Sequence, residues 1–351
     1  MNSYDVILHF ELVNLFHIQK YLFLNKKLNE FCKSLLILNS GDLGISSDLL
    51  SRFREEDLFN VCLKNNKDAC ELLNEKKYKI YVFGNGGTKD YRPWLEISNK
   101  KSKTIEISDL FGDFYNFSPR PHIVSLINPL LRDIFAIKCQ NIIYSNCLLW
   151  DRIDECLPYK LSKEDFFKKY SLDINLPLMV WFPDNICFNK DKTAADVYNR
   201  ACDLNNVIVK LHPNEYKKCA NKYGGLYSNV ILDRKSVKIL DFTDTHWCYK
   251  YMDCGLAYSS SIGIELPIYK KPCIYIDVDK KENVLFSEHY FKGNFSWVGT
   301  SCKLNEIEKF ISEKRYVADD IMYNNHLKKF LAHPERRAVD VLVEQIKEFL
   351  T

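Results

Sequence analysis

Two polar clusters in the second half of the chain follow strand-like apolar runs. His212 and Pro213 come directly after the run from Val207 to Leu211. The serine run Ser259–Ser261 follows Gly255 to Tyr258 and precedes a segment of helical character. Ligands of doubly wound sheets bind beyond the carboxyl ends of the strands. Both clusters are therefore predicted to line one ligand crevice.

The residue types in these clusters suit a nucleotide. Serine hydroxyls and the free N–H groups of a helix start, where the helix dipole is positive, together form a phosphate cradle. Gly263 lies in the first turn of that helix, and Glu265, one turn beyond Ser261, can accept both hydroxyls of a ribose. Pro213 directs the His212 ring into the crevice. Taken alone, the serine run could be only a helix cap and the His-Pro pair only a loop.

Strand-like and helix-like segments alternate along the chain, which is typical of parallel sheets covered on both faces. We predict an α/β protein of two Rossmann-like, doubly wound parallel-sheet domains facing across a cleft. The predicted domains are residues 1–165 on the acceptor side, residues 166–335 for the nucleotide donor, and a C-terminal helix, residues 336–351, packing back toward the N-terminal domain. The pattern also predicts helices from Glu55 to Leu73 and from about His122 to Ile137.

Composition limits the classes of protein. Among 351 residues, 49 Lys and Arg nearly balance 46 Asp and Glu, and lysine pairs such as Lys26-Lys27 are scattered, unlike the basic stripe of a nucleic-acid binder. The 13 cysteines form no C-x-x-C pair, which indicates reduced thiols. With no signal peptide and no apolar run near the roughly 20 residues of a membrane span, we expect a cytoplasmic protein, at most peripheral at the membrane.

Two stretches of the sequence resemble a known group of enzymes. Lys210 to Glu215 reads K-L-H-P-N-E, and Ser259 to Pro272 reads S-S-S-I-G-I-E-L-P-I-Y-K-K-P. These motifs resemble the nucleotide-binding half of GT-B enzymes that build bacterial surface polysaccharides. The group includes CDP-glycerol glycerophosphotransferase-like proteins, capsule Kdo transferases and bacterial sialyltransferases. The resemblance covers roughly Leu176 to Asp277.

The resemblance implies a role for each motif residue. It implies that His212 contacts the donor phosphate, that Ser260 and Ser261 bind the same phosphate, and that Glu265 holds the ribose. It implies a cytidine donor more than a uridine one, although neither base can be read from these residues. No cofactor is expected, because the histidine, the hydroxyls and the helix dipole would neutralise the leaving phosphate without a metal.

The first domain departs from the pattern of these relatives. Glycerophosphotransferase relatives carry a Trp-His-Gly stretch there, whose histidine is the general base, whereas Ile107 to Asp113 reads I-S-D-L-F-G-D. A carboxylate base, Asp109 or Asp113, is therefore easier to defend, although Asp109 could be only a helix cap. The further acceptor-side candidates are His9, Glu11, His17, Arg120 and His122. The simpler alternatives are a core position for His9 and a surface loop for Arg120 and His122.

These inferences favour a transferase. It would move a sugar or polyol phosphate from a nucleotide-activated donor to a hydroxyl of a glycan acceptor such as capsule, lipooligosaccharide or a teichoic-acid-like polymer. One alternative is an enzyme similar to UDP-sugar 2-epimerases, which share the two-lobed fold. Another is a non-catalytic partner in polysaccharide assembly.

Overall fold

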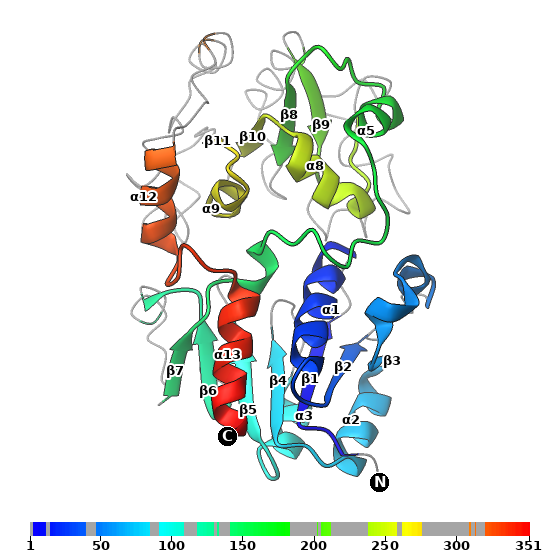
Figure 1. The fold of residues 1–351 in the computed structure, drawn as a ribbon, viewed down its shortest axis with the longest axis vertical. Coiled ribbons are helices and arrows are strands. Elements are labelled where there is room, and N and C mark those ends of the chain that lie inside the picture. Colours follow the sequence, from blue (N-terminus) through cyan, green and yellow to red (C-terminus); the bar gives the residue numbers. More distant parts are fainter. Residues whose placement is uncertain are drawn as a thin grey trace. The chain divides into compact units, whose positions relative to one another are not determined.

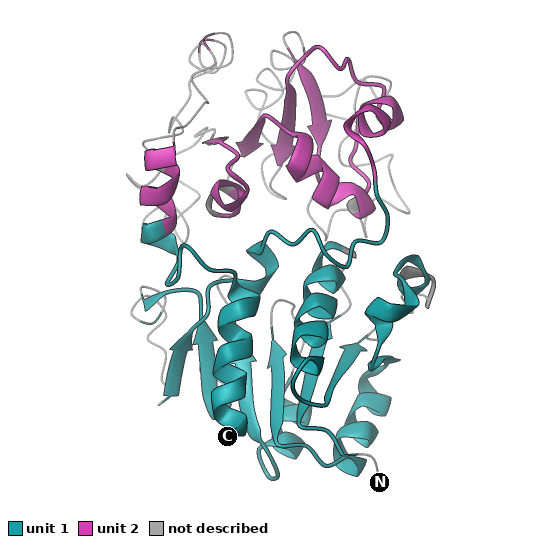
Figure 2. Ribbon diagram, viewed as in Figure 1, with its two compact units in different colours: residues 1–160, 328–351 teal, residues 161–327 magenta. Residues whose placement is uncertain are grey.

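The computed structural model describes residues 3–11, 15–39, 47–84, 91–108, 118–129, 132, 141–182, 202, 205–211, 238–257, 262–275, 309, 313 and 320–351. The chain forms two compact units (Figure 2). Unit 1 comprises Met1–Lys160 and Lys328–Thr351, and unit 2 comprises Leu161–Leu327. The sequence analysis set the corresponding boundaries at 165/166 and 335/336.

Unit 1 is built on a seven-stranded sheet with the order β3-β2-β1-β4-β5-β6-β7, in which every strand pair is parallel. The strands are β1 (Val6–Glu11), β2 (Ser34–Asn39), β3 (Val61–Lys64), β4 (Ile80–Gly84), β5 (Lys103–Ile107), β6 (Ile123–Leu126) and β7 (Asn141–Tyr144). The order reverses between β1 and β4, which is the switch point of a doubly wound sheet. Its carboxyl edge is therefore where a ligand would bind.

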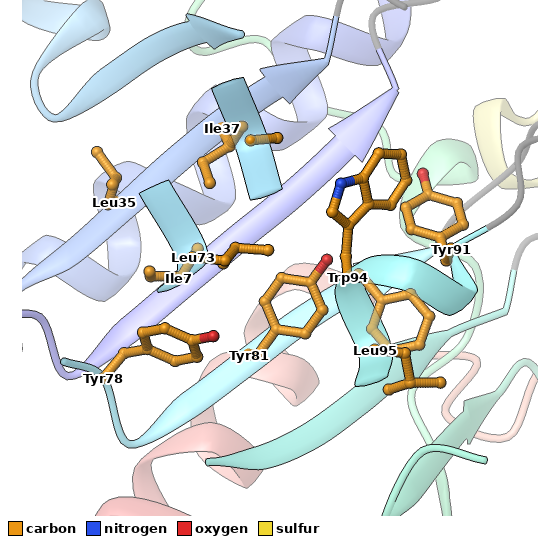
Figure 3. Packing of buried hydrophobic residues seen from close by; sticks show 11 residues of the cluster. Ile7, Leu35, Ile37, Leu73, Tyr78, Tyr81, Tyr91, Trp94 and Leu95 are labelled. Atoms are coloured by element: carbon orange, nitrogen blue, oxygen red, sulfur yellow. The ribbon is translucent and has the colours of Figure 1, made fainter. Parts of the chain in front are cut away.

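Helices cover both faces of this sheet (Figure 1). They are α1 (Leu15–Asn29), η1 (Ser47–Arg52), η2 (Glu55–Leu58), α2 (Asn66–Glu75), α3 (Arg92–Ser98), η4 (Leu148–Trp150) and α13 (Ala338–Leu350). Helix α13 packs beside α1 on one face. On the opposite face, α2 and α3 cover a cluster of large side chains that includes Tyr81 and Trp94 (Figure 3).

Two of the helices predicted from the sequence start too early. The segment from Glu55 to Leu73 divides into η2, strand β3 and helix α2, and α2 begins where the Asn65 side chain accepts the Asp68 N–H at 2.8 Å. The segment after His122 opens with strand β6. Short runs with β-branched residues suit a parallel strand. The strands that pair with β3 and β6 lie far away in the sequence, so the local pattern did not reveal the pairing.

The C-terminal segment is fastened to unit 1 by side chains that bind its backbone. The Asp151 carboxylate accepts the N–H groups of Ala338 (2.7 Å) and Val339 (2.8 Å), the first residues of α13. The Asn146 amide donates to the His333 carbonyl (2.7 Å) and the Arg336 carbonyl (3.0 Å). A carboxylate more than 180 residues earlier in the chain therefore caps the last helix.

Unit 2 contains a four-stranded parallel sheet of order β11-β10-β8-β9. Its elements are α5 (Lys163–Lys169), β8 (Leu178–Phe182), β9 (Asn206–Val209), η5 (Phe242–Asp244), α8 (Thr245–Tyr251), β10 (Cys254–Ala257), α9 (Ile262–Glu265), η6 (Leu266–Tyr269) and β11 (Cys273–Tyr275), while α12 (Asp320–Phe330) spans the boundary between the units. The chain passes from β8 to β9 on one side and later to β10 on the other, so the switch point lies at β8 and β10. Gly255 allows η6 to lie close to β10, because a Cβ there would meet Leu266 Cδ1 at 2.5 Å.

We predict that Asp151→Ala lowers the free energy of unfolding by roughly 1–3 kcal/mol, because two buried N–H groups lose their acceptor. Urea denaturation followed by circular dichroism measures the change. The control is Asp340→Ala, which removes only the partly exposed ion pair with Arg337 in the same helical turn and should cost less than about 1 kcal/mol. Equal losses in the two variants would contradict the capping role.

Candidate active site

Several predicted donor-site residues lie outside the described residues: His212, Pro213, Ser259, Ser260 and Ser261. Their proposed contact with a shared phosphate stays a prediction. Two flanking residues are described. Lys210 follows β9, and Glu265 ends α9, which comes after β10. Gly263 lies within the single turn of α9.

Lys210 and Glu265 both follow strands at the carboxyl edge of the sheet in unit 2. The Lys210 N–H donates to the Trp181 carbonyl at 2.9 Å, so the backbone of Lys210 continues the pairing of β9 with β8. Its ammonium lies 5.9 Å from the centre of the Phe182 ring and 6.0 Å from that of Tyr249. Burial lowers the pKa of Lys210, and the Glu265 carboxylate opposes this by raising it. The structure therefore places a cation and an anion from two sides of β8 in mutual electrostatic range.

His9 lies in the core of unit 1 at the switch point. The Asn39 amide donates to Nε2 at 3.2 Å, which leaves Nδ1 to donate to the Tyr81 hydroxyl at 2.7 Å. The Trp94 ring packs against the imidazole with 4.6 Å between ring centres. His9 is fully buried, and both ring nitrogens are engaged. This environment favours the structural alternative for His9.

The other acceptor-side candidates divide between two ends of the sheet. Glu11 ends β1 at the carboxyl edge, and His17 lies in the first turns of α1, which starts from that edge. Arg120 and His122 precede β6 and lie at the amino edge, where Thr104 Oγ1 is 2.8 Å from His122 Nδ1. The structure therefore places Arg120 and His122 at the opposite edge of the sheet from Glu11, and an acceptor-side role for them stays a prediction.

Asp109 and Asp113 lie outside the described residues, but the residue before them is placed. Ser108 is buried, and its N–H donates to the Ser125 carbonyl at 2.8 Å. The chain therefore leaves the sheet at the carboxyl edge of β5 and β6, next to Asp109. Either aspartate as general base stays a prediction.

The sequence analysis missed Glu106, which lies within β5. Its side chain is 5% exposed, and among the described residues it makes no hydrogen bond or ion pair. It shares a sheet face with His9, because Phe83 on β4 is the register partner of both. Burial raises the pKa of the Glu106 carboxyl to about 8. A glutamate between the two isoleucines Ile105 and Ile107 was the signal for it in the sequence.

A carboxyl in this position is suited to proton transfer. Strands lie about 4.8 Å apart, so Glu106 and His9 are separated by about 10 Å across the face. Gly84, the last residue of β4, has a positive φ of 106°, and a Cβ there would lie 3.3 Å from Glu106 Cγ. Glycine thus leaves room beside the carboxyl at the end of β4. A buried carboxyl with a raised pKa at a ligand edge is a typical acid–base group.

The described residues include no cluster of three or more His, Cys, Asp or Glu that could hold a metal ion. Asp277-Val278-Asp279, a carboxylate pair of the D-x-D type, lies outside them. Metal independence therefore stays a prediction. Within the same segments, every helix is too short or too polar to cross a bilayer.

Comparisons with known proteins concern the fold. No protein-family model and no curated protein matches the chain. Among solved structures, the UDP-GlcNAc 2-epimerase of Methanocaldococcus jannaschii matches with a TM-score of 0.64 at 11% identity, over 98% of this chain and 99% of that one. The wall teichoic acid polymerase TagF, soaked with CDPG, matches with a TM-score of 0.63 at 12% identity, over 99% of this chain and 89% of that one. The Neisseria meningitidis UDP-GlcNAc 2-epimerase bound to UDP-GlcNAc matches with a TM-score of 0.61 at 13% identity, over 98% of this chain and 100% of that one.

The fold is GT-B. Two parallel α/β sheets and near-complete coverage by these structures confirm the predicted fold class of two Rossmann-like, doubly wound domains. At such low identity the likeness to these neighbours extends to the fold alone. In a GT-B chain, Glu106 belongs to the N-terminal Rossmann-like unit, and the Lys210 and Glu265 pair belongs to the C-terminal one.

We predict that Glu106 makes stability depend on pH. The carboxyl keeps its proton in the folded state up to about pH 8 but loses it near 4.5 when unfolded. The unfolded state therefore binds fewer protons between these values, and stability falls as pH rises through this window. Glu106→Gln removes the penalty and should be more stable than the wild type at pH 8 by roughly 2–5 kcal/mol, with little difference at pH 4.

Denaturation curves at several pH values measure this difference. Glu75→Gln, which changes an exposed carboxylate at the end of α2, is the control and should stay within about 0.5 kcal/mol throughout. A pH-independent difference for Glu106→Gln would contradict the raised pKa.

Proposed function

We propose that the chain is a metal-independent GT-B transferase that moves a sugar or polyol phosphate from a nucleotide-activated donor to a hydroxyl of a bacterial surface glycan. One observation carries the proposal: each of the two sheets has ionisable side chains near its carboxyl edge. These are Glu106 in unit 1 and Lys210 with Glu265 in unit 2. The structural neighbours, a UDP-GlcNAc 2-epimerase bound to UDP-GlcNAc and a teichoic acid polymerase soaked with CDPG, agree with a nucleotide-linked substrate.

Unit 2 would hold the donor. In this proposal, Ser260, Ser261 and His212 neutralise the donor phosphate, while Glu265 accepts the ribose hydroxyls. Phosphate recognition by hydroxyls, a helix start and an imidazole supplies charge stabilisation where negative charge develops on the leaving group. The resemblance to the surface-polysaccharide enzymes implies a CMP- or CDP-linked donor more than a uridine-linked one.

Unit 1 would activate the acceptor. An acceptor hydroxyl attacks the anomeric carbon or the phosphorus of the donor. The new bond forms from the acceptor oxygen, the bond to the leaving phosphate oxygen breaks, and the nucleotide departs with that electron pair. The hydroxyl proton passes to a carboxylate base, for which Glu106 joins Asp109 and Asp113 as a candidate. With a pKa of about 8, ionised Glu106 would be a stronger base than an ordinary carboxylate.

A UDP-sugar 2-epimerase is the second candidate. The epimerase structures match over nearly their whole length, 99% and 100% of their chains. A carboxyl that is largely protonated at neutral pH also suits proton transfer within a bound sugar. An epimerase would return an isomerised nucleotide sugar, whereas a transferase would release the nucleotide.

We predict that CMP, CDP or their conjugates raise the melting temperature of the protein, since a ligand at 100 times its Kd stabilises by about 2.7 kcal/mol. Incubation with a CMP- or CDP-linked donor and acceptor glycan should release the free nucleotide.

Glu106→Gln should lower kcat by about 10²- to 10⁴-fold without loss of stability. Asp109→Asn and Asp113→Asn are compared in parallel to assign the base.

Each alternative gives a distinct result in these assays. Isomerisation of a UDP-sugar without nucleotide release would favour the epimerase. Nucleotide binding without any turnover would favour a non-catalytic assembly partner. Stabilisation by uridine compounds alone would remove the cytidine preference.

The proposal includes a peripheral position at the cytoplasmic face of the membrane. The amino edge of the unit 1 sheet supports this position. It contains ten Lys and Arg but only four Asp and Glu, whereas the net charge of the whole chain is only +3. Lys347 lies 5.6 Å from the ring centre of the exposed Phe31, and Lys103 lies 4.3 Å from that of Phe349. The amino edge consists of residues 3–5, 27–33, 75–79, 99–103, 118–122 and 347–351.

We predict that the protein sediments with vesicles containing anionic phosphatidylglycerol and not with phosphatidylcholine vesicles. Each lysine near such a surface contributes about 1 kcal/mol, so Lys76→Glu, Lys77→Glu and Lys100→Glu together should weaken binding at least tenfold. The same three charge reversals at Lys163, Lys168 and Lys250 in unit 2 are the control. Equal sedimentation with phosphatidylglycerol and phosphatidylcholine vesicles would contradict this role of the amino edge.

A further inference from the structure

Two exposed phenylalanines lie at the amino edge of the unit 1 sheet. Phe59 is 64% exposed and Phe31 is 38% exposed, and no other large apolar side chain that the structure describes in unit 1 is exposed. Phe31 lies in the turn from α1 to β2, and Phe59 lies in the turn from η2 to β3. Strands β2 and β3 are neighbours in the sheet, so the two turns lie side by side. Exposed apolar side chains that lie together mark an interaction surface, whereas isolated ones are common.

Hydrogen bonds fix these two turns to one another. The Asn60 side-chain amide donates to Asn29 Oδ1 at 3.1 Å, and the Asn25 side-chain amide donates to the Phe59 carbonyl at 3.0 Å. The Leu36 N–H of β2 donates to the Asn60 carbonyl at 2.9 Å. Asn60 has a positive φ of 53°, which asparagine adopts more readily than most residues. Both exposed rings are therefore attached to an ordered, hydrogen-bonded backbone.

Lysines accompany the aromatic rings of this edge. The ammonium of Lys347 lies 5.6 Å from the centre of the Phe31 ring. The same arrangement recurs in the pairs Lys33 with Tyr4 (4.9 Å), Lys101 with Tyr78 (4.9 Å) and Lys103 with Phe349 (4.3 Å). This combination of residues suits a bilayer interface, because apolar side chains enter the boundary between headgroups and acyl chains while basic side chains meet lipid phosphates.

The acidic residues beside Phe59 are mostly paired with cations. The Asp57 carboxylate is buried, and it lies 2.9 Å from Arg54 Nε and 3.3 Å from Lys26 Nζ. Arg54 Nη1 also lies 2.8 Å from the Glu56 carboxylate. This pairing lowers the repulsion that an anionic lipid surface would meet around the Phe59 ring.

We propose that Phe31 and Phe59 insert into the interface of an anionic lipid bilayer and add an apolar component to the electrostatic binding of the amino edge. This inference rests on the peripheral membrane position in the proposed function. It names the side chains that enter the bilayer, and it requires binding that persists when salt screens the lysines. Both rings lie at the edge of the sheet opposite the carboxyl ends of the strands, so they take no part in the chemistry.

Sedimentation with phosphatidylglycerol vesicles at about 0.1 M and about 1 M NaCl tests the proposal, because the Debye length falls from about 10 Å to about 3 Å between these conditions. The wild type should still bind at the higher salt concentration. The double variant F31A/F59A should bind about 10- to 100-fold more weakly than the wild type, and it should lose binding completely at the higher salt concentration. The variant F31L/F59L keeps apolar side chains and should retain most of the wild-type affinity.

A matched control and two further measurements separate insertion from a structural role. The double variant I174A/I321A removes two comparably exposed apolar side chains from unit 2, and it should bind vesicles like the wild type. Because Phe31 and Phe59 are exposed, the melting temperature of F31A/F59A should stay within about 2 °C of the wild type. Nucleotide release with a soluble acceptor should also be unchanged in this variant.

The outcomes distinguish this inference from the proposed function. Equal binding of F31A/F59A and the wild type, lost in both at high salt, would overturn insertion and leave the electrostatic membrane position standing. Weaker binding together with a lower melting temperature would show that the rings support the fold and would also overturn it. A dimer that F31A/F59A abolishes without a change in vesicle binding would assign the rings to a contact between copies of the chain instead. A wild type that binds no vesicle at either salt concentration would contradict the peripheral position, and this inference with it, but not the transferase chemistry.

Discussion

Parallel strand pairing is the constraint on which the described structure depends. In both sheets every pair of neighbouring strands runs in the same direction, so all carboxyl ends of a sheet meet at one edge. Residues distant in the sequence, such as Trp181 at β8 and Lys210 after β9, thereby become neighbours in space. The two switch points, between β1 and β4 and between β8 and β10, follow from strand order alone.

Burial of ionisable groups gives the two edges their chemical character. Glu106 lies among apolar neighbours with no partner in the described structure, which favours its neutral form. Lys210 is half-buried as well, but it has Glu265 in electrostatic range, and the two effects on its pKa oppose each other. An isolated carboxyl in a core normally weakens a fold. Its presence beside Gly84 at the end of β4 is easier to explain by proton transfer than by packing.

The return of the chain to unit 1 relies on polar side chains rather than apolar burial alone. Asp151 caps α13, and Asn146 binds the carbonyls of His333 and Arg336 just before it. Lys20, a buried lysine of α1, donates to the Asp151 carbonyl. Because Asp151 and Asn146 bind the backbone of the C-terminal segment, N-terminal and C-terminal segments of the chain complete the same unit.

The sequence by itself determined the alternation of strands and helices, the α/β class and the division into two Rossmann-like domains. Apolar runs such as Val6 to Phe10 and Leu178 to Phe182 are local signals. They can be recognised as strands without knowing which strands pair with them. The tertiary structure alone decided that Val61 and Ile123 belong to strands, because their register partners Leu36 and Ile105 lie far away in the sequence. It alone placed His122 at the amino edge, engaged both ring nitrogens of His9 in the core, and buried the side chain of Glu106. A residue type shows what chemistry is possible, but burial and the distance to a partner are properties of the folded chain, and these set protonation and role.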